Sequence, residues 1–197
     1  MTATVTTSLS SIRTDPIRSF KFLVNIYNPT GSGRKSLAGK NGLGFMTVSG
    51  LNFQTDIIPY RQGGYNTTPQ KMPGQTDFSP LSLSRGALVG TSQAWDWNRQ
   101  MFTVLQGTGT GGPGDDFRGT TDVQVLDHPV TSTTNIPIKL WIRLYRTWPS
   151  GIAYSDLDAG GNGFMVESMT MAHEGFIMAW AANTPGADVP ASAIKAA

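Results

Sequence analysis

Residues 136–146 read IPIKLWIRLYR, and this stretch decides the fold class. Apolar side chains recur at every second position, which is the period of a β-strand. One face of that strand would carry Ile136, Ile138, Leu140, Ile142 and Leu144. The other face would carry Lys139, Trp141, Arg143 and Tyr145. A face that meets only water would not usually carry Trp and Tyr, so the sequence predicts that this second face meets a neighbour.

Shorter runs of the same kind predict further strands over residues 20–27, 45–51, 53–61, 81–84, 122–126 and 164–177. Residues 62–80 are predicted to be a long loop or an extended hairpin, and residues 148–163 a turn-rich connection. One helix is predicted over residues 92–106, where Ala94, Trp97, Met101 and Val104 repeat at three and four residues. The fold class that follows is mainly β, an antiparallel sandwich or partly closed barrel with one short α-helix.

The length of 197 residues suits one domain, expected over residues 15–180, with an N-terminal arm over 1–14 and a C-terminal tail over 181–197. Fifteen basic and thirteen acidic residues give a net charge of +2, too weak to indicate nucleic-acid binding by bulk charge. Only 14% of residues are charged. Depletion of charge is typical of surface that is hidden in subunit contacts, although an ordinary low-charge β domain explains it equally well.

The residues with chemical potential do not form a recognisable catalytic, cofactor or metal site. Cysteine is absent, which excludes thiol nucleophiles and thiolate metal sites. The glycine-rich string at 107–112 follows a helix instead of a strand, so it indicates a loop and not a dinucleotide site. Residues 156–161 resemble the start of a calcium loop without its final glutamate. The two histidines, His128 and His173, have no partners at catalytic spacing, and we expect no enzyme activity and no cofactor.

Two more features concern location. No segment approaches the roughly 18 apolar residues that a membrane-spanning helix needs. The N-terminal residues are rich in Ser and Thr and lack the apolar core of a secretory signal. We therefore expect a chain that folds in a cytoplasm and does not enter a membrane as a monomer.

Several short segments form an ordered set from residue 15 to about residue 177. They are DPIRSFKFLV at 15–24, VSGL at 48–51, YRQGG at 60–64, KMPG at 71–74, LSLSRG at 81–86, WDW at 95–97, WP at 148–149, and ESM with AHEG within 167–175. In this order and spacing they resemble the contractile-tail tube family, which includes phage tail tube proteins. Gln62 stands where the family usually has an acid, and residues 28–44 and 107–121 look like inserted loops.

The resemblance implies a non-enzymatic building block. Members of the family form six-subunit rings that stack into a hollow tube inside a contractile sheath, and strands of neighbouring subunits join into one ring barrel around the lumen. The implied partners are further copies of the chain, the sheath protein, the baseplate and tail-terminator proteins, and a tape-measure protein and DNA in the lumen. The implied location is the virion tail, assembled in the host cytoplasm.

Three functions remain open at this point. A phage tail tube that passes DNA is preferred, because inserted loops and a long tail are common decorations in phages. The inner tube of a phage-derived injection system, which delivers protein effectors, is the alternative within the family. A monomeric carbohydrate-binding β-sandwich, a different class of protein, would also explain exposed Trp and Tyr side chains.

Two sets of site residues follow from the resemblance. The segment 60–74 reaches the adjacent ring in the family, which implies inter-ring contacts through Tyr60, Arg61, Gly63, Gly64, Lys71 and Pro73. The polar residues of the closing segment, Glu167 and Glu174, are expected to pair with basic side chains, because a buried charge needs a partner. The candidates are Arg18, Arg61, Arg85 and Arg143. At least one such pair is expected to cross between subunits.

Overall fold

The computed structural model describes residues 17–28, 35–36, 44–64, 67–87, 93–105, 117–126, 137–182 and 189–193. Its elements are β1 (Phe22–Asn28), β2 (Lys35–Ser36), β3 (Thr47–Ser49), β4 (Phe53–Tyr60), β5 (Gln70–Phe78), β6 (Leu81–Gly86), α1 (Gln93–Leu105), β7 (Gly119–Leu126), β8 (Ile138–Tyr154), β9 (Val166–Ala172), β10 (Gly175–Trp180) and the 3-10 turn η3 (Ala191–Ala193). The prediction of a mainly antiparallel β protein with one short helix is confirmed.

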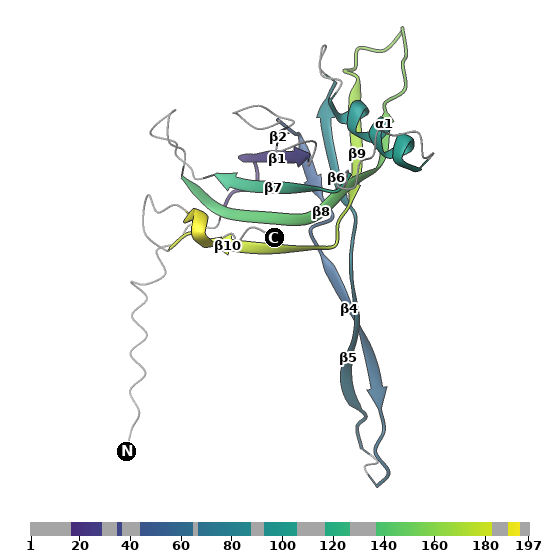
Figure 1. Ribbon diagram of the computed structural model, residues 1–197, viewed down its shortest axis with the longest axis vertical. Coiled ribbons are helices and arrows are strands. Elements are labelled where there is room, and N and C mark those ends of the chain that lie inside the picture. The colour runs from purple at the N-terminus through teal and green to yellow at the C-terminus, as the bar shows by residue number, and fades with distance from the viewer. Residues whose placement is uncertain are drawn as a thin grey trace.

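The long strand β8 organises the fold because it runs through both parts of one bent sheet (Figure 1). Its first part pairs with β7 on one side and β10 on the other, and its last part pairs with β9. Between the two parts lies Arg146, whose φ of +50° is unusual for a residue other than glycine. A strand that passes from one part of a bent sheet to the other needs a local bend of this kind.

The predicted turn-rich connection over 148–163 is wrong for its first half. Residues 148–154 continue β8, because Trp148 to Tyr154 pair with Ala172 to Glu167 of β9. The predicted strand over 164–177 is instead two strands, β9 and β10, which meet at His173 and Glu174. The helix is confirmed over Gln93–Leu105, and residues 62–80 supply one strand of an extended hairpin. The glycine-rich string at 107–112 and His128 lie outside the described residues.

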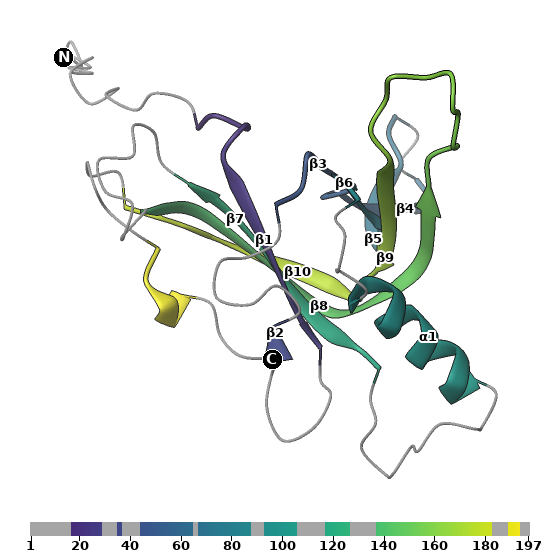
Figure 2. The ribbon, with the colours of Figure 1, turned by 90° about the horizontal axis from the view of Figure 1, so that it is seen from above.

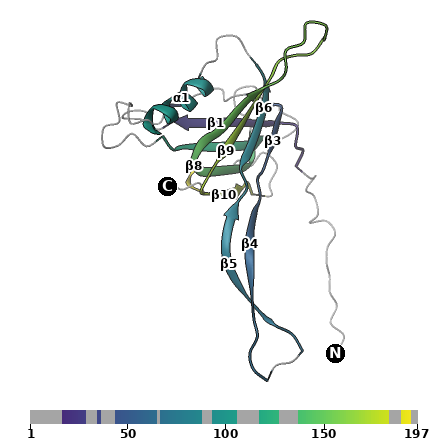
Figure 3. The ribbon, with the colours of Figure 1, turned by 90° about the vertical axis from the view of Figure 1, so that its right-hand side faces the viewer.

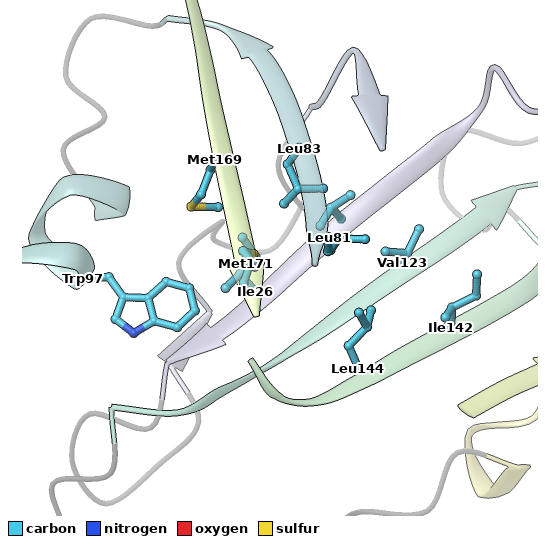
Figure 4. Close-up of a cluster of buried hydrophobic side chains, with 10 residues drawn as sticks. Ile26, Leu81, Leu83, Trp97, Val123, Ile142, Leu144, Met169 and Met171 are labelled. Atoms are coloured by element: carbon cyan, nitrogen blue, oxygen red, sulfur yellow. The ribbon is translucent and has the colours of Figure 1, made fainter. Parts of the chain in front are cut away.

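The two parts of the sheet are seen from above in Figure 2, and the buried hydrophobic side chains between them form the core (Figure 4). Its buried members are Val24, Ile26, Leu81, Leu83, Trp97, Val123, Ile142, Leu144, Met169 and Met171. The predicted apolar face of residues 136–146 thus supplies Ile142 and Leu144 to this core. Trp97 brings α1 onto it and donates its indole N–H to the carbonyl oxygen of Phe117 at 3.0 Å. Within the described part of the chain, the strands form an open bent sheet and not a closed barrel.

Residues 189–193 of the C-terminal tail lie against the first part of the sheet. The Val189 amide donates to the carbonyl oxygen of Ile138 at 3.1 Å, and the Val189 side chain is buried beside Ala179. Trp141, from the second face of residues 136–146, packs in the same small cluster. Part of the second face of residues 136–146, which the sequence predicted to meet a neighbour, is therefore covered by the chain's own tail.

Candidate assembly surfaces

Strands β4 and β5 form a two-stranded arm that extends away from the body (Figures 1 and 3). Eight residues at about 3.4 Å each give β4 a length of roughly 27 Å. The register runs from Phe53 opposite Phe78 to Tyr60 opposite Gln70, with an irregularity between Thr55 and Ile57. An isolated two-stranded hairpin is marginally stable in water, so an arm of this length is expected to be stabilised by another surface.

The arm exposes large apolar side chains on both of its faces. Phe53, Ile57, Ile58, Tyr60 and Met72 are each more than half exposed. Because successive side chains of a strand point to opposite faces, Ile57 and Ile58 place apolar groups on both sides of the ribbon. A contiguous exposed apolar surface marks an interaction site. The uninterrupted pair Ile57-Ile58 is the sequence signal that could have indicated this, since a strand with one solvated face alternates.

Most of the predicted inter-ring residues lie near the outer end of this arm. Tyr60 lies opposite Gln70 and Lys71 lies opposite Pro59, both near the outer end of the arm. Pro73 lies opposite Ile57. Gly64 lies in the connecting turn with a φ of +92°, which a residue with a Cβ rarely adopts. Arg61 and Gly63 are exposed in the same turn. The structure thus places five of these residues at the protruding end of the arm and Pro73 about halfway along it.

The base of the arm is held by a cluster of four rings. Phe53 and Phe78 of the arm have ring centroids 6.2 and 5.7 Å from that of Phe176 on β10. The His173 ring lies 5.6 Å from Phe78. Its Nε2–H donates to the carbonyl oxygen of Ser79 at 3.0 Å, and burial lowers the pKa of His173 below its ordinary value. This cluster fixes the direction in which the arm leaves the body.

Glu167 forms a buried ion pair within one subunit. Its Oε2 lies 2.6 Å from Nε of Arg85, and both side chains are only 6% exposed. The two residues stand directly opposite each other on β9 and β6. The hydroxyl of Tyr154 donates to the other carboxylate oxygen at 3.4 Å. Desolvation of that hydroxyl, together with the Glu167 carboxylate, raises the pKa of Tyr154, although the residue as a whole is exposed. The pair joins β6 to β9, and Tyr154 adds β8, so the three residues connect three strands at the rim of the core.

Glu174 lies in a different environment from Glu167. Its carboxylate is half exposed and lies 3.2 Å from Nη1 of Arg118 and 3.6 Å from Nε of Arg146, neither of which was among the predicted partners. Among the described residues, no ion pair involves Arg18 or Arg61, and both are exposed. The expectation that at least one ion pair crosses between subunits stays a prediction.

Arg143 pairs with Asp122, a residue that the sequence analysis did not single out. The guanidinium donates through Nε and Nη2 to the two carboxylate oxygens, both at 2.7 Å, and the Asp122 side chain is fully buried. This hydrogen bonding raises the pKa of Arg143 above its ordinary value. The only sequence signal for this ion pair was the single acid Asp122 within the strand GTTDVQVL. An acid on the solvent-exposed side of a strand would give the same pattern.

The described residues provide little for chemistry. No group of three or more His, Cys, Asp or Glu side chains in the described ranges could hold a metal ion. Within the same ranges, no helix is long and apolar enough to cross a membrane. What the structure presents instead are extended surfaces: an apolar arm, a rigid base for it, and a sheet with open edges.

Such surfaces are those of a subunit that assembles. The chain belongs to the T4-like virus tail tube protein gp19 family, whose model matches residues 18–177. The resemblance noted in the sequence is therefore confirmed, and membership makes the chain a structural subunit of an inner tail tube.

Solved structures show the same fold. A chain in the cryo-EM structure of the anti-feeding prophage baseplate matches with a TM-score of 0.64 and 19% identity, covering 84% of this chain and 96% of that chain. A chain in the sheath–tube complex of an extracellular contractile injection system in the extended state matches with a TM-score of 0.63 and 22% identity, covering 88% of this chain and 99% of that chain. No curated protein matches this sequence.

Proposed function

We propose that this chain forms the inner tube of a contractile phage tail, in which six-subunit rings stack into a conduit for DNA ejection through the host envelope. The observation that carries the proposal, beside family membership, is the arm with apolar side chains on both faces. A free monomer would leave that surface in water, whereas stacked rings would cover it. The role is mechanical, and we infer that the chain is not an enzyme.

The proposed partners follow from the same role. They are further copies of the chain, a surrounding sheath, a baseplate and a terminator at the two ends, and a tape-measure protein and DNA within the lumen. The similar solved chains come from a baseplate and a sheath–tube complex, which supports an assembly of this kind. The subunits would assemble in the host cytoplasm and remain in the virion.

Electron microscopy of the purified chain tests this proposal. We expect tubes of stacked rings with six-fold symmetry. Deleting residues 62–70, the tip of the arm, should leave folded subunits or rings that do not elongate. If that deletion still gave tubes of normal length, the proposed role of the arm in stacking would be wrong. A rotational symmetry other than six-fold would contradict the proposed six-subunit ring.

An injection-system tube that delivers protein effectors remains the second candidate within the family. The fold shared with a sheath–tube complex of an injection system favours it, but that fold is common to both kinds of tube. Genes for a capsid and a terminase beside this one would support the phage. The carbohydrate-binding alternative has no further support, because the family is one of tube proteins.

A further inference from the structure

The loop between β8 and β9 exposes two large apolar side chains. Leu157 is 82% exposed and Phe164 is 92% exposed, the highest values among the large apolar residues that the structure describes. Met165 and Tyr154, at the foot of the loop, are exposed as well. Single exposed apolar residues are ordinary, but four at one end of a molecule form a patch that favours a protein partner.

This loop has a defined shape. Its ends are joined by the Ser155 amide, which donates to the Val166 carbonyl oxygen at 2.8 Å, and by the Val166 amide, which donates to Oγ of Ser155 at 3.0 Å. At the tip, the Gly160 amide donates to Oδ1 of Asp158 at 2.9 Å. The apolar side chains are therefore presented by a loop that is closed at its base and turned at its tip.

The β8–β9 loop and the outer part of the arm, residues 57–76, carry opposite charges. The loop has two exposed acids, Asp156 and Asp158, and no basic residue between positions 155 and 165. Residues 57–76 of the arm have two exposed bases, Arg61 and Lys71, and no acid, whereas the two exposed acids of the arm, Asp56 and Asp77, lie nearer the body. Charge complementarity of this kind guides one surface to another and penalises like-charged pairings.

The two surfaces lie at opposite ends of the molecule. The β8–β9 loop projects at the top of the body, and the arm projects at the bottom, along the longest axis (Figures 1 and 3). They therefore cannot meet within one subunit. A contact between two different surfaces of identical subunits is heterologous, and its repetition in one direction generates an open-ended stack.

We infer that the β8–β9 loop is the docking site for the arm of a second copy of this chain, in the adjacent ring. Leu157 and Phe164 pack on the apolar side chains Ile58, Tyr60 and Met72 of that arm, and the acids of the loop face its bases. The inference rests on the proposed stacking of rings and adds to it the acceptor of the arm. It explains why both projections expose apolar groups in one subunit.

Disulfide trapping tests the contact directly, since the chain has no cysteine. Leu157→Cys is combined in one chain with Ile58→Cys, Tyr60→Cys or Met72→Cys, because a disulfide forms only between Cα atoms about 4.4–6.8 Å apart. After oxidation of assembled tubes, we expect at least one combination to give a ladder of dimers, trimers and longer chains in denaturing gels. The single variants, and Leu157→Cys with Ser82→Cys on the exposed side of β6, should give no ladder.

Charge reversal provides an independent test. Asp156→Lys with Asp158→Lys should reduce tube length or yield by about tenfold or more, and Arg61→Glu with Lys71→Glu should do the same. The four changes together should restore assembly, because the charges are again complementary. A general folding defect would not be rescued in this way, and circular dichroism of each variant provides the control.

Each negative result has a distinct meaning. If the parent chain forms tubes but no cysteine pair gives a ladder, the inference is wrong. It is also wrong if the loop variants form tubes of normal length and fail only to bind sheath, since the loop would then face the sheath. If the parent chain forms no tubes at all, the proposed function fails, and the docking contact fails with it.

Discussion

Replacing Glu167 with glutamine removes the negative charge from the buried pair with Arg85 and changes the shape of the side chain little. The guanidinium then stays 6% exposed with no carboxylate 2.6 Å from its Nε. Burying a charge without its partner is costly, and breaking a buried pair in this way typically destabilises a protein by about 3–5 kcal/mol. Because both partners belong to one subunit, the cost should fall on the folding of the subunit, before assembly begins.

Thermal unfolding of unassembled subunits measures this cost. In a domain of about 150–250 residues, 1 kcal/mol shifts Tm by about 2–4 °C, so Glu167→Gln should lower Tm by about 6–20 °C. Protein concentration must be equal in all samples, because assembly raises the apparent Tm. The matched control is Arg85→Met with Glu167→Leu, which removes both charges and should recover most of the loss.

Two results would contradict the reasoning. If Glu167→Gln unfolds within about 2 °C of the parent, the pair contributes too little to be a buried, unscreened interaction. If the double apolar variant is as unstable as the single variant, the loss comes from packing or from the hydrogen bond of Tyr154, and not from an unpaired charge.

Three further outcomes are expected. Glu174→Ala should lower Tm by less than about 4 °C, because its half-exposed pairs contribute under about 1 kcal/mol. Gly50→Ala should destabilise the subunit in urea unfolding by about 2 kcal/mol or more, since φ is +93° and a Cβ would clash with the Pro80 carbonyl oxygen. Gly63→Ala is the control and should be neutral, because a Cβ there would meet no other atom. Because burial lowers the pKa of His173 in the folded subunit, the imidazole takes up a proton more readily in the unfolded chain. The free energy of unfolding should therefore fall as pH drops below about 6.5. His173→Gln should reduce this pH dependence in melting curves measured from neutral pH to about pH 5.

The sequence by itself determined most of the local elements and the class of protein. Alternation along residues 136–146 predicted a strand with a core face, and Ile142 and Leu144 are buried there. The three-and-four spacing around Trp97 predicted the helix, because that period places one stripe against a core. The short segments between residues 15 and 177 identified the family, because each marks a turn or a strand end and they follow one another in the order that the family has.

The tertiary structure alone decided which distant segments pair. Arg85 and Glu167 are 82 positions apart, and Asp122 and Arg143 are 21 apart. The register that places each base opposite its acid is set by strand pairing and not by local spacing. For the same reason, Asp122 could not be told from a solvated acid until its neighbours on β8 were known.

The reach of β8 and the position of the arm were also decided in three dimensions. Residues 148–154 contain Pro149 and Gly151, which locally favour a turn, yet they continue the strand because β9 supplies its partners. Apolar and polar residues alternate too little in segment 53–78 to predict which side of each strand is buried. Only the folded structure shows that this segment projects beyond the hydrophobic core of the subunit. Local sequence encodes the period of an element, whereas its partners and its exposure depend on contacts between parts of the chain that are far apart in sequence.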